Sequence, residues 1–328
     1  MTYRLESWTL IKISVIIVSW NAKDYLIKCL KSVQKEAREV DCEIIVVDNG
    51  STDGSVQAVR RLFPNVVLIE SRKNLGFAKA NNIGIKRCRG EYIFLVNSDV
   101  IILESAITKI INFLESHKTV GMLGPKVLNG DQTLQLSCRK KPTLTRFFLR
   151  AIGLEHLFKT ISYHSHQGLE EVDILSGCFW AIRREALDEV GLLDEQFFFC
   201  AEDKDWSIRF KQNNWKVVYY PEASIIHYEG ASSSNMPVYY YVEMLKANIK
   251  LWKKYHSIPS IFIYYILNIY YHLIRIISNW ILSLFQNNES KSSSLHKIER
   301  SREALKYLLN SRSKNNYLRS KTEVKDVP

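Results

Sequence analysis

The sequence lacks the two glycine-rich signatures by which α/β proteins most often bind nucleotide phosphates. No Gly-x-Gly-x-x-Gly follows the first apolar run, residues 13–18, and no Walker A lysine motif occurs in the 328 residues. Both motifs hold phosphates through backbone N–H groups, so their absence excludes the standard dinucleotide-binding and P-loop sites. A nucleotide bound by this chain would therefore be held by side chains.

Disulfide and secretion signals are also missing. The six cysteines form no Cys-x-x-Cys pair, and most lie in apolar surroundings, such as Cys178. Scattered thiols of this kind fit a reducing compartment better than a disulfide framework. The run 13–18 is too short for the apolar region of a signal peptide and no cleavage site follows it. We expect a cytosolic body without a signal peptide.

Charge, by contrast, is unbalanced: the formal net charge is +11, and residues 287–328 hold ten lysines or arginines against five acids. A basic chain suits nucleic acid, an anionic membrane surface or an anionic substrate. No stripe of basic residues interleaved with aromatics occurs, so we expect no nucleic-acid partner.

Apolar β-branched runs alternate four times with stretches of helical periodicity in the first 120 residues. The expected strands are residues 13–18, 43–47, 66–69 and 92–96, and the expected helices are 24–33, 55–63, 78–88 and 104–117. This alternation predicts an α/β fold with a mostly parallel sheet covered on both faces. Further on we expect an irregular stretch at 121–136, a strand at 174–182, and a strand at 216–220 that Pro221 ends.

Polar residues collect where the expected strands end: Asn21, Asp48, Asn49, Asn74 and Asp99. Ligands of open α/β sheets bind outside the carboxyl ends of the strands. A carboxylate such as Asp99 could hold a divalent cation there, because hard cations prefer oxygen ligands. An ordinary turn explains Asn97-Ser98-Asp99 equally well, since all three residues favour turns.

A second group of polar residues lies in the latter half of the chain. Glu202 and Asp203 precede an apolar helical pattern, where carboxylates are also favoured simply by the helix dipole. His227 follows an apolar pair, a position where a histidine is by default a hydrogen-bonded core or turn residue.

Eight segments, taken in order, resemble an inverting glycosyltransferase of family 2 with the GT-A fold, and most closely the bacterial rhamnosyltransferases of surface polysaccharide assembly. They are Val15–Asn21, Val47–Ser55, Asn74–Ala78 with Asn81–Gly84, Val96–Asp99, Ser176–Phe179, Gly191–Glu195, Glu202–Arg209 and Ile226–Ser232.

The resemblance implies a role for each matching residue. Asp203, beside Glu202, would be the catalytic base, and Asp99 with His227 would hold Mg²⁺ or Mn²⁺ against the diphosphate. The donor nucleotide would be bound by Asp48 at the nucleobase and by the other polar residues of the strand ends, namely Ser19, Asn21, Asn74, Asn81 and Asn97. The chain departs from the family at Asn97, where the fuller motif has an aspartate, so Asp99 alone supplies charge to the metal.

The chain is expected to divide into a catalytic domain (1–256), an apolar region (257–286) and a basic tail (287–328). In the apolar region the polar residues form one stripe: Ser260, Asn268, His272, Arg275, Asn279, Ser283 and Gln286. An amphipathic helix lying on a membrane, with this stripe towards water, accounts for the pattern. Packing on the catalytic domain or on a second copy is the alternative. For residues 143–163 we expect either a surface helix packed on the core or a flexible loop that faces the acceptor or the membrane. In the tail we expect a linker at 287–294 and a short helix at 298–309.

The resulting expectation is a metal-dependent inverting enzyme at the cytoplasmic face of the membrane, peripheral or monotopic, and a homo-oligomer is compatible with it. It would move rhamnose from dTDP-rhamnose to a lipid-linked saccharide. UDP-galactofuranose or a UDP-hexose are alternative donors. A sugar nucleotidyltransferase would need a glycine-rich loop after the first strand, which residues 19–23 do not form. A non-catalytic assembly scaffold is the remaining alternative.

Overall fold

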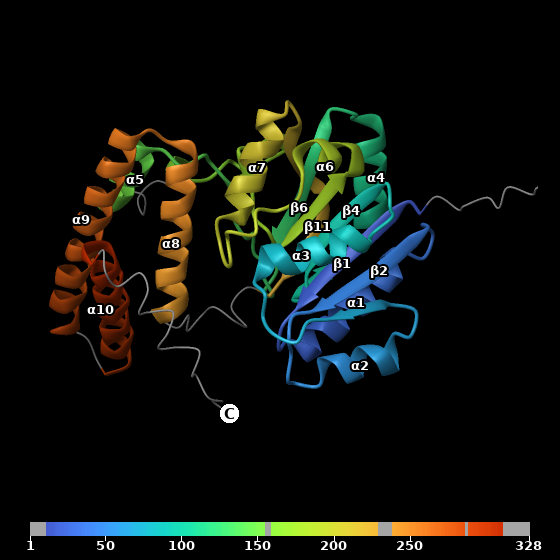
Figure 1. The fold of residues 1–328 in the computed structure, drawn as a ribbon, viewed down its shortest axis with the longest axis horizontal. Helices are drawn as coiled ribbons and strands as arrows, with labels where there is room; N and C mark the ends of the chain where they lie inside the picture. Colours follow the sequence, from blue (N-terminus) through green and yellow to red (C-terminus); the bar gives the residue numbers. More distant parts are fainter. Residues whose placement is uncertain (1–10, 155–158, 229–237, 286–287, 311–328) are drawn as a thin grey trace, which may run out of the picture. The chain divides into compact units, whose positions relative to one another are not determined.

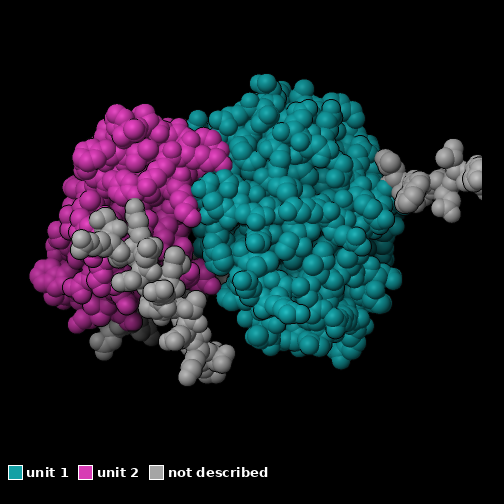
Figure 2. All heavy atoms as spheres, viewed as in Figure 1, with its two compact units in different colours: residues 1–141, 162–233 teal, residues 142–161, 234–328 magenta. Residues whose placement is uncertain are grey.

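A computed structural model describes residues 11–154, 159–228, 238–285 and 288–310 (Figure 1). The contacts between residues divide the chain into two compact units, coloured separately in Figure 2. Unit 1 comprises residues 1–141 and 162–233, and unit 2 comprises residues 142–161 and 234–328.

Unit 1 is built on one large twisted sheet with the strand order β3-β2-β1-β4-β10-β6-β11-β5, and β8 pairs with β11. Its strands are β1 (Ile13–Ser19), β2 (Cys42–Asp48), β3 (Val67–Glu70), β4 (Tyr92–Asn97), β5 (Val100–Ile102), β6 (Val120–Leu128), β8 (Glu170–Glu171), β10 (Phe179–Arg183) and β11 (Lys216–His227). Strands β3, β2, β1 and β4 pair in parallel, as do β6 and β11, whereas β10, β5 and β8 run antiparallel to their neighbours. The predicted mostly parallel α/β sheet is confirmed.

Helices cover both faces of this sheet (Figure 1). Helices α1 (Lys23–Glu36), α2 (Ser55–Leu62) and α4 (Ala106–Ser116) bury their apolar sides against one face of β1 and β4, in a core that contains Val15 and Phe94. On the other face, Ile16 and Leu95 belong to the core of α3 (Phe77–Arg87), α6 (Arg184–Val190) and α7 (Glu202–Gln212). Because β1 alternates its side chains between two cores, its apolar run has no polar face.

Three expectations for unit 1 were wrong. Residues 120–128 form β6, a central strand, although Gly121, Gly124 and Pro125 interrupt its apolar pattern. The glycines are required by packing, since a Cβ at Gly124 would lie 2.7 Å from the Leu175 side chain. Strand β11 continues past Pro221, with a register shift between Tyr220 and Ser224 that accommodates the proline. The strand expected at 174–182 is split into β9 (Ile174–Leu175), which pairs with β7 (Cys138–Arg139), and β10.

Unit 2 consists of helices: α5 (Leu144–Ala151), the short 3₁₀ helix η2 (Lys159–Ile161), α8 (Val238–Tyr255), α9 (Ile258–Ser283) and α10 (Asn288–Leu309). Helix α9 packs against α10, α5 and α8, and its buried residues are Tyr264, Asn268, His272, Asn279 and Ser283. The polar stripe therefore faces the interior of its own unit. The expectation that it faces water was wrong, because a helical repeat identifies a stripe but not the partner it packs on.

The outward side of α9 is apolar. Its exposed large side chains include Ile258, Phe262, Ile266, Ile277 and Trp280. Among the described residues, α9 is the one helix long and apolar enough to cross a membrane, by length and composition alone. Its apolar face has no partner within the part of the chain that the structure describes.

Helix α10 begins at Asn288, so residues 288–294 are helical and not the linker we expected. The expected helix at 298–309 is the second half of α10, and the tail from residue 311 lies outside the described residues. The division by contacts places α5 and α8 in the same unit as the C-terminal helices. The boundary of the catalytic domain expected after residue 256 stays a prediction.

Candidate functional site at the carboxyl edge of the sheet

Two buried polar atoms lie side by side where β1 and β2 end. Ser19 and Asp48 are paired in register, and their exposed fractions are 1% and 3%. Ser19 Oγ and Asp48 Oδ1 have no hydrogen-bond partner, whereas Asp48 Oδ2 accepts bonds from the backbone N–H groups of Gly50 and Ser51. Buried polar atoms are normally paired, so these two suit a ligand with polar edges.

The loops beside this pair are fixed by asparagines. Asn49 donates from Nδ2 to Asn74 Oδ1 (3.0 Å) and accepts from the Leu75 N–H (2.8 Å). Asn21, in the left-handed region (φ 48°), accepts from the Thr52 N–H (2.8 Å). Asn21 and Asn74 thus shape the loops around Asp48, and Asn49, outside the predicted donor set, connects two of them.

The first half of α3 is also polar and tightly packed. Asn81 is 2% exposed, and its side chain donates a hydrogen bond to the Phe77 carbonyl (3.0 Å). In this conformation it presents almost no surface to a bound nucleotide. Its neighbour Asn82 binds the loop at 193–195 through Leu193 and Glu195. Asn82 lies in the segment Asn81–Gly84 without a predicted role, and the structure gives it a positional one.

A carboxylate and an imidazole meet just beyond β4. Asp99 Oδ1 lies 3.3 Å from His227 Nε2, and both side chains are largely buried. Nδ1 of the same ring lies 2.8 Å from Gln135 Oε1, while Gln135 Nε2 donates to Asn129 Oδ1 and so orients the amide. The structure brings Asp99 and His227 together, and it adds Gln135, which lies in a stretch where the sequence carried no signal.

This arrangement suits a bound cation. Because Gln135 turns its oxygen towards Nδ1, that nitrogen carries a proton, and in the neutral form of the ring Nε2 would present a lone pair. A lone pair and a carboxylate then face each other, which a divalent ion between them would favour. Within the described ranges no group of three or more His, Cys, Asp and Glu side chains forms a metal site. A metal held here would therefore need further oxygens, such as those of a diphosphate.

Asn97 ends β4 beside this pair. Its N–H donates to the Cys178 carbonyl (3.0 Å), and its own carbonyl accepts from the Cys29 thiol (3.6 Å). Asn97 is held through its backbone, and its side-chain amide forms no hydrogen bond with any described residue. It is therefore available to a ligand.

The acidic pair stands at the start of α7, after two residues in the left-handed region, Cys200 (φ 64°) and Ala201 (φ 72°). Glu202 is buried, its Oε2 has no partner, and burial followed by the charge of Asp203 raises its pKa to about 8. Asp203 is more exposed and accepts from the Lys204 N–H. Of the two carboxylates, Asp203 is thus the one that a ligand can reach, and a largely protonated Glu202 lies beside it at neutral pH.

The loop before α7 contacts the start of α3. The Phe77 N–H donates to the Phe198 carbonyl (3.1 Å), and Gly76 has φ 84°. A Cβ at Gly76 would lie 2.5 Å from that carbonyl oxygen, so the close approach requires glycine. The start of α7 is thereby tied to the loop of Asn74. Among the described residues, Asp203 forms no hydrogen bond or ion pair with Asp99 or His227.

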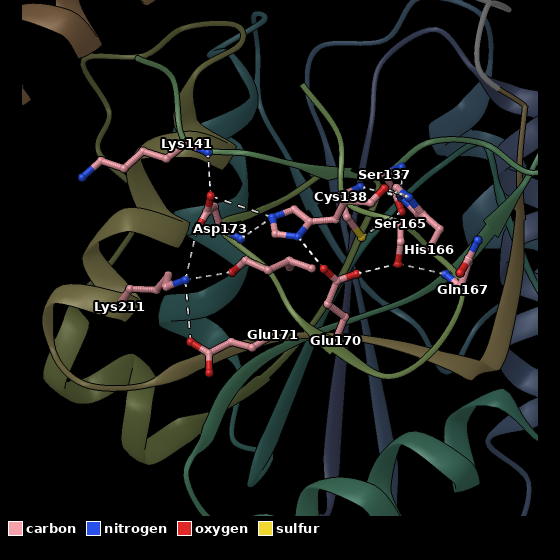
Figure 3. Close-up of polar contacts among 12 residues, drawn as sticks. Ser137, Cys138, Lys141, Ser165, His166, Gln167, Glu170, Glu171, Asp173 and Lys211 are labelled. Atoms are coloured by element: carbon pink, nitrogen blue, oxygen red, sulfur yellow. Dashed lines mark hydrogen bonds and ion pairs between the residues drawn. The ribbon is translucent and has the colours of Figure 1, made fainter. Parts of the chain in front are cut away.

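A polar network fixes the far end of α7 (Figure 3). Lys211 lies 3.2 Å from Asp173 Oδ1 and 3.6 Å from Glu171 Oε1. Asp173 also accepts from the Lys141 N–H, next to β7, and from it the chain leads into β9. The network thus connects α7 to the small β7–β9 sheet.

Two histidines hold the segment that leads into this network. His166 Nε2 accepts from the N–H groups of Ser137 and Cys138 (3.0 and 2.9 Å), and burial lowers its pKa. His164 Nδ1 lies 2.8 Å from Glu170 Oε1. A ring nitrogen that accepts two hydrogen bonds must be unprotonated, so His166 is a neutral structural histidine.

Comparison with known proteins identifies the family. Residues 14–191 match the family model described as Glycosyl transferase family 2. An N-acetylglucosaminyl-diphospho-decaprenol L-rhamnosyltransferase of Mycobacterium tuberculosis is 29% identical over 240 residues, which are 68% of this chain and 78% of that protein.

Solved structures share the fold. A mannosyltransferase from Pyrobaculum calidifontis, in complex with GDP-Man and Mn²⁺, is 16% identical with a TM-score of 0.54, over 90% of this chain and 87% of that one. GalNAc-T7 with UDP, GalNAc and Mn²⁺ is also 16% identical, with a TM-score of 0.52, over 76% of this chain and 53% of that one.

Proposed function

The chain belongs to glycosyltransferase family 2, and from that premise we propose that it transfers a sugar from a nucleotide diphosphate to a hydroxyl of a lipid-linked saccharide, with inversion. The observation that carries the proposal is the contact between Asp99 and His227 beside the unpartnered atoms Ser19 Oγ and Asp48 Oδ1. One edge of the sheet thereby offers donors and acceptors for a nucleoside and two ligands for a metal at its diphosphate.

Rhamnose from dTDP-rhamnose is the first candidate donor, because a relative aligned over 68% of the chain is a rhamnosyltransferase acting on a diphospho-decaprenol substrate. UDP-galactofuranose and UDP-hexoses are the other donors. Cell-surface polysaccharide assembly follows from the same relative and from a poly(ribitol-phosphate) β-glucosyltransferase that is 38% identical over 36% of this chain.

In the proposed reaction Asp203 takes the proton of the acceptor hydroxyl as that oxygen attacks the anomeric carbon. The attack comes from the side opposite the diphosphate, so the product has the inverted configuration. A positioned carboxylate base contributes typically ~10²–10⁴-fold to such a step. Because burial keeps Glu202 largely protonated at neutral pH, Glu202 adds little negative charge beside the base.

Asp99 and His227 would hold Mn²⁺ or Mg²⁺, and Gln135 would keep the imidazole in the tautomer that offers Nε2. The ion, when bound, supplies positive charge to the departing diphosphate. A neutral imidazole favours Mn²⁺ over Mg²⁺. Asn97, which lacks a charge, would bind a ribose hydroxyl.

The apolar side of α9 would rest on the cytoplasmic membrane face, where a lipid-linked acceptor is found. Its Ile, Phe and Trp side chains suit the boundary between headgroups and acyl chains. Ile277→Lys should then release the full chain from phospholipid vesicles, whereas Leu62→Lys, at an exposed site on α2, should not. Equal binding of both variants would contradict this location, and self-association in place of vesicle binding would indicate a second copy as the partner.

The transfer itself is tested with purified full chain, Mn²⁺, a lipid extract and a panel containing dTDP-rhamnose, UDP-galactofuranose and UDP-hexoses. Nucleotide release, with a product whose anomeric configuration is opposite to the donor's, is the expected result. A product with the donor's anomeric configuration would contradict inversion. If no donor yields free nucleotide, the alternative of a non-catalytic assembly scaffold is favoured.

A further inference from the structure

The strand that carries His227 ends at that residue, beside Asp99. Pairing of β11 with β6 reaches Ile226, and its pairing with β5 reaches His227, opposite Val100. One further backbone hydrogen bond follows, from the Tyr228 N–H to the Asp99 carbonyl (3.1 Å). Chain segments at the ends of such pairing open more readily than the core of a sheet. The position of the imidazole therefore depends on what holds Tyr228.

The Tyr228 side chain contacts two segments that are distant from it in the sequence. Its ring centre lies 5.5 Å from that of Tyr25 on α1, with the ring planes at 47°. On the loop after β6, a Cβ at Gly130 would lie 3.0 Å from Cε1 and 3.1 Å from Cδ1 of the Tyr228 ring. Gly130 does not have a left-handed φ, so glycine is favoured there by the close approach of the ring and not by the backbone.

The loop after β6 is closed by its own hydrogen bonds and contacts the imidazole as well. The Asn129 N–H donates across the loop to the Thr133 carbonyl (2.8 Å). Two residues further on, Gln135 Oε1 lies 2.8 Å from Nδ1 of His227. The same loop therefore holds the imidazole at Gln135 and the ring of the following residue at Gly130.

Tyr25 lies in the first turn of α1, and the start of this helix is attached to the loop after β2. The Lys23 N–H donates to Asp53 Oδ2 (2.8 Å), and the Asn21 N–H donates to Ser51 Oγ (3.0 Å). The contact between the two tyrosine rings thus connects the end of β11 to the side of the site where the nucleobase is predicted to bind.

We propose that Tyr25 and Tyr228 are positioning residues of the metal site, whose ring contact holds the end of β11 against α1 and keeps His227 Nε2 opposite Asp99. Tilted aromatic pairs with ring centres about 4.5–7 Å apart are favourable beyond the apolar area that they bury. Neither ring needs to touch the ion, because a residue that orients a metal ligand acts through that ligand. The metal role rests on the proposed function, whereas the attachment of β11 to α1 does not.

Hydrogen exchange of the Tyr228 amide, followed by nuclear magnetic resonance in the full chain without metal, tests the attachment. Tyr25→Ala removes the ring partner without changing a sequence neighbour of that amide, and should speed its exchange about threefold to tenfold. Tyr25→Phe keeps the ring and should exchange within about twofold of the unchanged protein. Phe148→Ala removes a 46% exposed ring on α5 and should leave the rate unchanged. A rate that Tyr25→Ala does not alter would overturn the attachment.

Binding of Mn²⁺ in the presence of a nucleoside diphosphate, measured by electron paramagnetic resonance, tests the positioning role. Tyr228→Ala should lower the Mn²⁺ affinity about 10–100-fold, the loss typical of groups that orient metal ligands, and Tyr228→Phe should recover most of it. Gly130→Ala keeps both rings, but its Cβ displaces one of them, so it should also lower the affinity. Thermal unfolding establishes which variants fold, and Gly130→Ala tests the role even if Tyr228→Ala does not fold.

The outcomes separate this inference from the proposed function. Mn²⁺ affinities of Tyr228→Ala and Gly130→Ala equal to that of Phe148→Ala would overturn the positioning role and leave the proposed function intact. If the unchanged protein binds no Mn²⁺ while Tyr25→Ala still speeds the exchange, the metal site of the proposed function fails and the attachment of β11 to α1 stands.

Discussion

Asp99 Oδ1 lies 3.3 Å from His227 Nε2, and Nδ1 of that imidazole lies 2.8 Å from Gln135 Oε1. The three residues come from the turn after β4, the end of β11 and the segment after β6. The amide fixes the ring so that its lone pair faces the carboxylate. Such a contact is favourable with a second proton on the ring or with a cation between the two atoms, and the proposed metal would supply that cation.

Asp99→Asn should weaken binding of Mn²⁺ in the presence of a nucleoside diphosphate by more than about 100-fold. Loss of groups that merely orient a ligand already costs about 10–100-fold, and Asp99 supplies the only charge. Electron paramagnetic resonance of Mn²⁺ measures the free ion directly. Asp41→Asn, at an exposed carboxylate near the other end of β2, should bind like the unchanged protein. Equal Mn²⁺ binding by the two variants would remove Asp99 from the metal site.

Gln135→Leu should lower Mn²⁺ affinity by roughly 10–100-fold, because His227 loses the acceptor that sets its tautomer. Gln135→Glu keeps an oxygen at Nδ1 and should retain most of the affinity. Gln57→Leu, an exposed glutamine on α2, controls for the loss of an amide. If Gln135→Leu and Gln57→Leu bind Mn²⁺ alike, Gln135 has no role in orienting the ring.

Glu202→Gln should remove a pH dependence of stability. The folded pKa is raised from 4.5 to about 8, so between these values the unfolded chain is ionised while the folded chain keeps its proton. The free energy of unfolding of the unchanged protein therefore falls as pH rises through this window. Gln cannot ionise, so the variant should gain relative stability from about pH 5 to about pH 8. Denaturant unfolding at a series of pH values measures this free energy. If its pH dependence is the same in Glu202→Gln and in the unchanged protein, as expected for the exposed Glu39→Gln, the raised pKa is contradicted.

His166 gives the opposite sign. Burial lowers its folded pKa below 6.5, so below that pH the unfolded chain binds a proton that the folded chain does not. Stability contributed by His166 is complete above pH 6.5 and falls as the pH drops through it. His166→Asn suits the left-handed φ of 56° but cannot titrate there, so its unfolding free energy should be lower at pH 7 and flatter towards pH 5. An unchanged slope would assign the acid sensitivity to another group.

Strong local patterns made the first half of the sheet predictable. The apolar runs of β1, β2 and β4 are largely buried, and each ends in a polar turn. Asp99 and His227 could be paired in advance only through the family resemblance, because β4 and β11 are not neighbours in the sheet.

Long-range packing decided the rest. Strand β6 contains two glycines and a proline, and it is a strand through its pairing with β10 and β11, while Trp215 and Leu175 occupy the space that side chains at Gly121 and Gly124 would need. The polar stripe of α9 was visible as a periodicity, but its direction depends on α10, which starts at Asn288, earlier than local composition indicated. Gln135 carried no motif at all, since its role comes only from the His227 ring beside it.

Asp203 is proposed to remove the proton of the acceptor hydroxyl. A comparison of kcat for Asp203→Asn and Glu202→Gln tests this role, using the donor from which the unchanged protein releases nucleotide. Asp203→Asn should lose ~10²–10⁴-fold in kcat with donor affinity unchanged, and Glu202→Gln should lose far less, because Gln resembles the protonated acid. Near-normal turnover by Asp203→Asn would contradict the account.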